Sequence, residues 1–149
     1  KTIVQPPDIT ATIYEIINVE VPYEIHGKSL IPIIKGEKEK IRDFAISSPS
    51  IIHGSPAGEK ITITDKSGWC YIYESEKGEI YDVKVVDSIE RIPVKGKIKG
   101  EELYFLPEDP QQIKNVINEN KKKGEELRNK ILEFLYEVKT DEKIIKLWF

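Results

Sequence analysis

The sequence predicts an α+β fold, in which an antiparallel sheet of about four strands packs against a long C-terminal helix and short helices lie at the N-terminus. Apolar residues recur at helical spacing near both ends, alternate with polar residues in the middle, and are separated by Gly, Pro and Ser. With 149 residues, 39% of them hydrophobic and 33% charged, the chain is expected to form a single domain with a substantial core.

Two short helices are predicted in the first 36 residues. We expect residues 1–7 to be extended, because they end in a Pro pair, and Asp8 to cap the first helix. Ser29 is expected to cap a second helix over residues 30–35, which Gly36 ends. The apolar residues that share one face of the first helix are Ile9, Ile13, Ile16 and Ile17.

The middle of the chain reads as a sheet. The strands are predicted over residues 43–48, 60–65, 69–74, 79–88 and 102–106. Residues 89–100 are expected to form a loose hairpin or an exposed insertion. Trp69, Tyr71 and Tyr73 share one strand face, which either packs under a helix, the commoner arrangement, or stacks on a ligand.

The last forty residues predict a helix and a tail. Asp109 is expected to cap a helix that opens at Pro110, breaks or kinks within residues 118–124 and resumes over 125–138. Residues 142–149 form a last apolar segment, predicted as a strand or a docked tail.

Composition excludes several classes of partner. The net charge of −3, with both signs interspersed, argues against nucleic-acid binding, and no apolar run is long enough to span a membrane. The single cysteine, Cys70, rules out an internal disulfide and slightly favours a cytoplasmic location, although many secreted proteins also lack disulfides. The abundance of Ile, Lys and Glu is thermophile-like, and a chain that starts with Lys rather than Met is expected of a fragment.

One motif of the N-terminal third resembles a known family. Residues 8–12 read D-I-T-A-T and residues 27–36 read G-K-S-L-I-P-I-I-K-G. This order resembles the passage after the catalytic core in sulfatases of the alkaline-phosphatase superfamily. There, a helix of the type D-hydrophobic-x-x-T precedes G-x-S-L-x-P-x-hydrophobic-x-G.

A second motif extends the resemblance. Residues 102–116, E-L-Y-F-L-P-E-D-P-Q-Q-I-K-N-V, are similar to the sulfatase ending E-L-Y-D-L-x-x-D-P-x-E-x-x-N-L. The hairpin over residues 60–74 stands where sulfatases carry a pair of strands with a Gly and a Trp at the turn. The resemblance covers about residues 4–137, and residues 76–100 look like an insertion without a counterpart.

The catalytic motif of such enzymes is missing from this sequence. Sulfatases use a formylglycine nucleophile made within C/S-x-P-x-R, and no such pentapeptide occurs here, since Cys70 is followed by Tyr-Ile-Tyr. We therefore assign no catalytic residue and no metal ligand. The resemblance implies a divalent cation of the calcium type and a formylglycine for the complete enzyme, and no cofactor in this chain. The candidate substrate-binding residue is His53, in a loop rich in Ser, Pro and Gly, and its alternative role is that of a solvent-exposed histidine.

Two functions follow as hypotheses. In the first, the chain is the non-catalytic C-terminal part of a sulfatase-like, metal-dependent ester hydrolase, with residues 1–36 as a helical junction and residues 43–149 as sheet plus helix. It would buttress the catalytic domain upstream in the same polypeptide and supply a loop to the substrate pocket. In the second, it is a stand-alone structural or protein-interaction module. Both leave self-association through the apolar N-terminal helix possible, and the ester (sulfate, phosphate or phosphonate) stays open.

Overall fold

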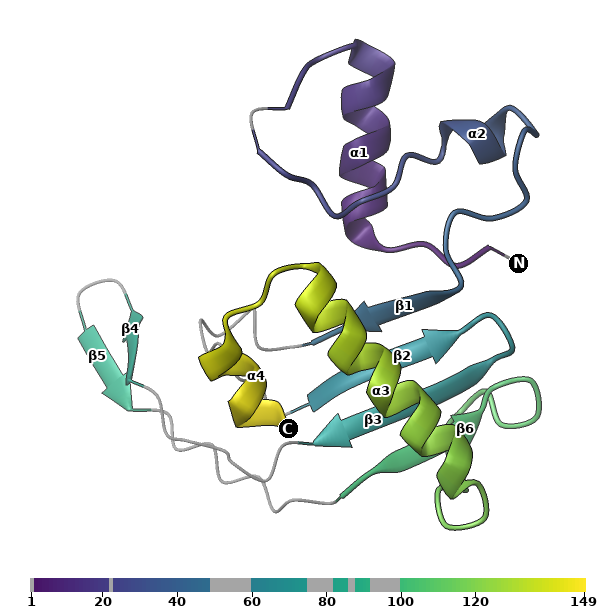
Figure 1. Cartoon of the computed structure of the whole chain (residues 1–149), viewed down its shortest axis with the longest axis vertical. Helices are drawn as coiled ribbons and strands as arrows, with labels where there is room; N and C mark the ends of the chain where they lie inside the picture. The colour runs from purple at the N-terminus through teal and green to yellow at the C-terminus, as the bar shows by residue number, and fades with distance from the viewer. Residues whose placement is uncertain (1, 22, 49–59, 75–81, 86–87, 92–99) are drawn as a thin grey trace. The chain divides into compact units, whose positions relative to one another are not determined.

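The protein has the predicted α+β fold in a computed structural model (Figure 1). The structure describes residues 2–21, 23–48, 60–74, 82–85, 88–91 and 100–149. The elements are α1 (Pro6–Ile17), α2 (Ile31–Ile34), β1 (Phe44–Ser47), β2 (Lys60–Asp65), β3 (Trp69–Glu74), β4 (Asp82–Val85), β5 (Ser88–Arg91), β6 (Glu102–Phe105), α3 (Lys121–Glu137) and α4 (Glu142–Trp148). None of the helices in these ranges is long and apolar enough to cross a membrane.

The chain forms two compact units. The first, here called the N-terminal unit, contains Lys1–Ala45 and Thr64–Ser67. The second, the C-terminal unit, contains Ile46–Ile63 and Gly68–Phe149. Each unit is described by itself below.

The main sheet is antiparallel, with the strand order β1-β2-β3-β6. Strands β3 and β6 pair Trp69 with Phe105 and Tyr71 with Leu103. Strand β3 therefore has neighbours on both sides. The strand predicted over residues 79–88 contains β4, which is not part of the main sheet but pairs with β5, beginning at Ser88, in a separate two-stranded sheet.

The turn before β3 requires a glycine. Gly68 has a φ of +89°, in the left-handed region that side chains with a Cβ rarely adopt. A Cβ at this position would also lie only 2.6 Å from Cδ of Pro107. The Gly68 carbonyl accepts the Leu106 N–H at 2.9 Å, and the Trp69 and Phe105 rings lie 4.8 Å apart, so the turn and the end of β6 are held together.

The core lies between α3 and the sheet. The buried apolar side chains are Ile61, Ile63, Cys70, Tyr71, Tyr73, Leu103, Tyr104, Leu127, Ile131 and Ile145. Helix α3 crosses the sheet over β3 (Figure 1), and Gly124 lets it approach closely: a Cβ there would lie 3.7 Å from the Tyr71 ring and 2.5 Å from Ile117. This confirms the aromatic strand face as a face under a helix. Cys70, which lies on the opposite face of β3, is also buried.

Helices α1, α3 and α4 differ from their predictions. Helix α1 starts at Pro6 rather than after Asp8, because a proline in the first turn loses no hydrogen bond. Residues 110–120 form turns, with Gln112 at a φ of +56°, so Pro110 opens no helix and α3 begins at Lys121. The last segment is a helix, α4, whose N-cap Asp141 accepts the Lys143 N–H at 2.8 Å.

Candidate functional site

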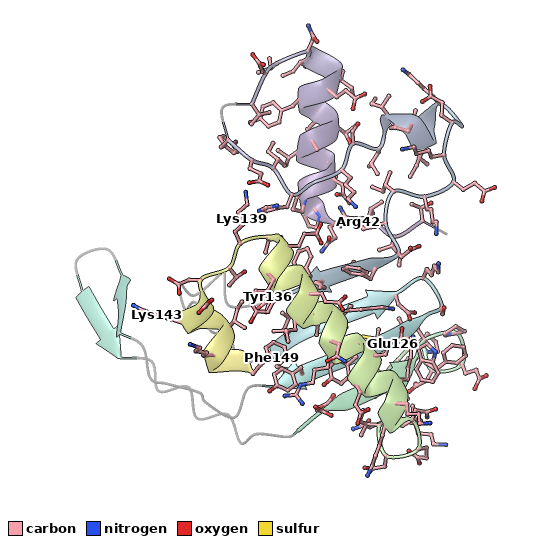
Figure 2. The ribbon with its side chains drawn as sticks, viewed as in Figure 1. Arg42, Glu126, Tyr136, Lys139, Lys143 and Phe149 are labelled. Carbon is pink, nitrogen blue, oxygen red and sulfur yellow. The ribbon has the colours of Figure 1, made fainter. Side chains whose placement is uncertain are left out.

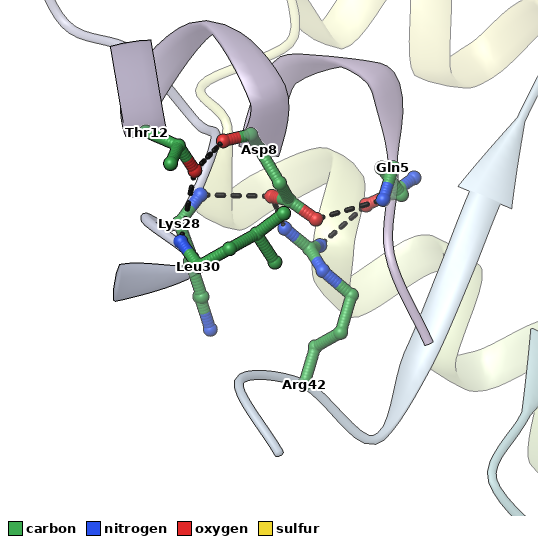
Figure 3. A network of polar contacts seen from close by, with 6 residues as sticks. All are labelled: Gln5, Asp8, Thr12, Lys28, Leu30 and Arg42. Atoms are coloured by element: carbon green, nitrogen blue, oxygen red, sulfur yellow. Dashed lines mark hydrogen bonds and ion pairs between the residues drawn. The ribbon is translucent and has the colours of Figure 1, made fainter. Parts of the chain in front are cut away.

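The first sulfatase-like motif forms a buried polar network in the N-terminal unit (Figure 3). We call it the Asp8–Arg42 network, and its members are Gln5, Asp8, Thr12, Lys28, Leu30 and Arg42. The Asp8 carboxylate has no solvent exposure and accepts the backbone N–H groups of Gln5 at 2.7 Å and Lys28 at 2.8 Å. The Arg42 guanidinium, which is 8% exposed, donates to both Asp8 and the Gln5 carboxamide. One carboxylate therefore joins the start of α1 to two segments far along the chain.

Thr12 and Gly27 complete the connection. The Thr12 hydroxyl donates to the Asp8 carbonyl oxygen at 2.6 Å and accepts the Leu30 N–H at 2.9 Å. Gly27 lies against Pro7 so closely that a Cβ would collide with the Pro7 carbonyl group. The Asp, Thr and Gly of this motif are thus explained by packing and hydrogen bonding. Both carboxylate oxygens of Asp8 already accept hydrogen bonds, so the network has a structural role.

Sequence analysis identified Asp8 but not its main partner. The N-cap residue of α1 is Gln5 rather than the predicted Asp8, which lies three residues later and whose carboxylate accepts the Gln5 N–H in a capping box. Arg42 is 34 residues away from Asp8, in a charged stretch that carries no local signal of burial.

The second motif covers the outer edge of β6. The Asp109 carboxylate accepts the N–H groups of Ile113 at 3.0 Å and Lys114 at 2.9 Å, which hold its pKa below the usual value. The Asn115 carboxamide oxygen then accepts the Leu103 N–H at 3.0 Å, and the Leu103 carbonyl accepts the Val116 N–H at 2.8 Å. The Asp and the Asn of this motif therefore satisfy backbone groups at a sheet edge.

Two long connections of the main sheet, one of which contains the predicted substrate-binding residue His53, begin and end at the same end of the sheet. Because the sheet is antiparallel, β1 and β3 end where β2 and β6 begin (Figure 1). The chain from Ser48 to Lys60, which contains His53, starts and returns at this end. So does the chain between β3 and β6, which contains β4 and β5. His53 itself lies outside the described residues.

A cationic and aromatic cluster lies at the same end, within the C-terminal unit. Phe149, which is labelled in Figure 2, follows α4 at the end of the chain. Its ring stacks on the ring of Tyr73, near the end of β3, with centroids 5.1 Å apart and planes 3° apart. The guanidinium carbon of Arg128, from α3, lies 5.0 Å from the Tyr73 centroid and 5.4 Å from that of Phe149. Glu101, just before β6, completes the cluster, with Oε1 3.7 Å from Nη1 of Arg128.

Two buried tyrosines of the C-terminal unit have raised pKa values. Burial, followed by the nearby Glu101 carboxylate, raises the pKa of Tyr71, whose buried hydroxyl has no hydrogen-bond partner of good geometry within the described residues. Burial and a 2.8 Å hydrogen bond to Glu102 raise the pKa of Tyr104 to about 12. Both hydroxyls are therefore neutral at physiological pH. Among the described residues, no three His, Cys, Asp or Glu side chains gather closely enough to hold a metal ion.

Known structures share this fold. No protein-family model matches the chain, and no curated protein does. A sulfatase described as BT33336S-sulf, from a study of glycosaminoglycan metabolism by Bacteroides thetaiotaomicron, is 20% identical with a TM-score of 0.56, over 90% of this chain and 24% of that one. BT4656, a sulfatase solved in complex with its substrate D-glucosamine-2-N,6-O-disulfate, is 22% identical with a TM-score of 0.57, over 92% of this chain and 25% of that one.

The fold fits a sulfatase C-terminal region. The resemblance drawn from the two motifs is therefore confirmed at the level of the fold. The chain spans about a quarter of the length of the two sulfatases that it matches.

The raised tyrosine pKa values predict the behaviour of the protein at high pH. Because folding favours the neutral phenol, Tyr104 contributes stability that is complete below its unfolded pKa of about 10 and is lost as the pH rises through about 12. In an alkaline titration followed by tyrosinate absorbance, Tyr104→Phe should remove an ionisation step near pH 12. The control, Tyr136→Phe, replaces an exposed tyrosine of α3 and should keep that step. Loss of the same step in both variants would contradict the assignment.

Proposed function

We propose that the chain is the non-catalytic C-terminal part of a sulfatase-like, metal-dependent ester hydrolase. The observation that carries this proposal is the likeness to two sulfatases, which extends over nine-tenths of this chain but only a quarter of theirs. The absence of a C/S-x-P-x-R pentapeptide from the sequence agrees with it. The formylglycine and a divalent cation of the calcium type would then belong to the catalytic domain upstream in the same polypeptide, and no residue of this chain is assigned to them.

The C-terminal unit would support the substrate pocket of that enzyme. Its sheet gives a rigid base, and the chain between Ser48 and Lys60 begins and ends at the same sheet end as the Arg128 cluster. Loops carried on a rigid sheet commonly provide recognition groups. His53 is the residue of this segment that we propose for hydrogen bonding to a substrate. The substrate of one structural neighbour, a disulfated glucosamine, suggests a sulfated sugar as the substrate class.

The outer face of α1 is the surface that we propose to pack on the catalytic domain. The helix is inverted relative to an ordinary amphipathic helix: its buried residues are Asp8 and Thr12, while its isoleucines are 51–64% exposed. These isoleucines are Ile9, Ile13, Ile16 and Ile17. Exposed apolar clusters of this kind mark interaction surfaces. The same observation favours the second function, a protein-interaction module, if the partner is another chain.

The exposed face predicts self-association of the 149-residue chain. In sedimentation velocity over a range of concentrations, the parent chain should shift from monomer to larger species as the concentration rises. The double variant Ile13→Glu/Ile16→Glu should remain monomeric, because two charges replace exposed apolar side chains. A parent chain that stays strictly monomeric at high concentration would count against an interaction surface on α1.

A substitution of His53 tests whether this chain contributes to the substrate pocket. In a longer polypeptide that includes the catalytic part, His53→Ala should change the ratio of kcat/KM values between two sulfated sugars by about tenfold, as expected for one lost hydrogen bond. The thermal midpoint should not change. The matched control is His26→Ala, which removes the other histidine, an exposed residue of the N-terminal unit. Equal kcat/KM ratios in the parent and the His53 variant would refute the proposed role.

A further inference from the structure

Arg128 is held in a fixed position by two aromatic rings. Its guanidinium carbon lies 5.0 Å from the centroid of Tyr73 and 5.4 Å from that of Phe149, within the range of a cation–π interaction. The two rings are themselves stacked, and Tyr73 is 8% exposed. The guanidinium therefore lies close to both rings, and these two contacts restrict its position.

The N–H groups of Arg128 are weakly engaged by the described part of the chain. Glu101 is its only ionic partner within the described residues, and the nearest oxygen and nitrogen are 3.7 Å apart, too far for a hydrogen bond. In that same part of the chain the guanidinium donates no hydrogen bond at all. The side chains of Arg128 and Glu101 are 40% and 38% exposed, so a ligand can reach both. A positioned guanidinium with free N–H groups is suited to binding an oxyanion.

The surroundings of the pair point in the same direction. The Tyr71 hydroxyl is buried near Glu101 and has no well-formed hydrogen bond to any described residue, which is an unusual state for a buried polar group. Glu101 is the charged group that most affects this hydroxyl, and a Glu101 carboxylate displaced from Arg128 would be available to accept it.

We propose that Arg128 binds a sulfate group of a sulfated sugar, with Glu101 as the group that the sulfate displaces. This inference rests on the proposed function and adds a recognition residue to it. Two oxygens of a sulfate can accept two parallel N–H groups of the guanidinium, a geometry that an ammonium group cannot provide. Arg128 lies at the sheet end where the His53 segment begins and ends, and this position agrees with a role in the proposed pocket.

The alternative is that the cluster only attaches α4 to the sheet. In that case Arg128 would contribute to folding through its contacts with Tyr73 and Phe149, and anions would bind no better here than elsewhere. The two roles differ in the effect of Glu101→Gln. If Arg128 binds sulfate, removal of the competing carboxylate should raise the affinity for sulfate. If the cluster is purely structural, the same change should leave anion binding unaffected and should lower the stability of the fold or leave it unchanged.

The experiment is a calorimetric titration of the 149-residue chain with disulfated glucosamine, with inorganic sulfate and with unsulfated glucosamine. We expect saturable binding of the disulfated sugar, weaker binding of inorganic sulfate and none of the unsulfated sugar. Arg128→Gln should weaken binding of the disulfated sugar by about tenfold to a hundredfold, and Arg128→Lys by less, because Lys keeps the charge but not the paired donors. Glu101→Gln should strengthen it by about threefold, since it removes a nearby like charge.

The control variant is Lys130→Gln, on the same helix. Lys130 pairs with Glu126 at 2.6 Å and should not affect the affinity for the sugar. Thermal midpoints of all variants establish that each one is folded, and Arg128→Lys keeps the test valid if Arg128→Gln does not fold. Equal affinities in the parent chain and in both Arg128 variants, or no binding by the parent, would overturn the inference. The effect of His53→Ala on the longer enzyme is measured separately, so either proposal can fail without the other.

Discussion

A buried carboxylate is the constraint on which the N-terminal unit depends. Burying a charge is costly unless it is paired and hydrogen-bonded, and Asp8 meets this requirement through Arg42 and two backbone N–H groups. These partners approach one side of α1, so the polar side of the helix faces its own unit. The isoleucines are then left on the outside. The proposed contact of α1 with a catalytic domain is therefore a consequence of how Asp8 is satisfied.

In the C-terminal unit, the two ends of the sheet differ in how their strands are connected. One end is closed tightly, since Gly68 contacts Pro107 and its carbonyl accepts the Leu106 N–H. The other end carries the chain that contains His53, together with the ring-supported Arg128. A rigid base with long connections at one end is a common arrangement for recognition. The proposed substrate contacts all belong to that end.

Local patterns predicted much of the fold. The alternation of Ile61 and Ile63 with threonines identified β2, and β3 was found with its observed bounds. Sequence patterns failed to predict the secondary structure where contacts between residues far apart in the sequence determine it. The turns over 110–120 form because Asp109 and Asn115 bind backbone groups, which overrides the helical start suggested by Pro110. The candidate site was harder to predict. Arg128 is one of several charged residues of α3, and it differs from the others by its contacts with Tyr73 and Phe149, which are far apart in the sequence. The resemblance to sulfatases came from motifs whose residues hold segments together.

The most direct test of this account is a double-mutant cycle on Asp8→Asn and Arg42→Gln, measured by urea unfolding. Each single variant should cost about 3–5 kcal/mol, because it leaves a buried group without its partner. The double variant should cost much less than the sum, with a coupling energy of about 2 kcal/mol or more. The exposed pair Lys40 and Asp43, 2.6 Å apart, serves as the control and should show no measurable coupling. Additive costs for Asp8 and Arg42 would contradict the claim that their interaction organises the N-terminal unit.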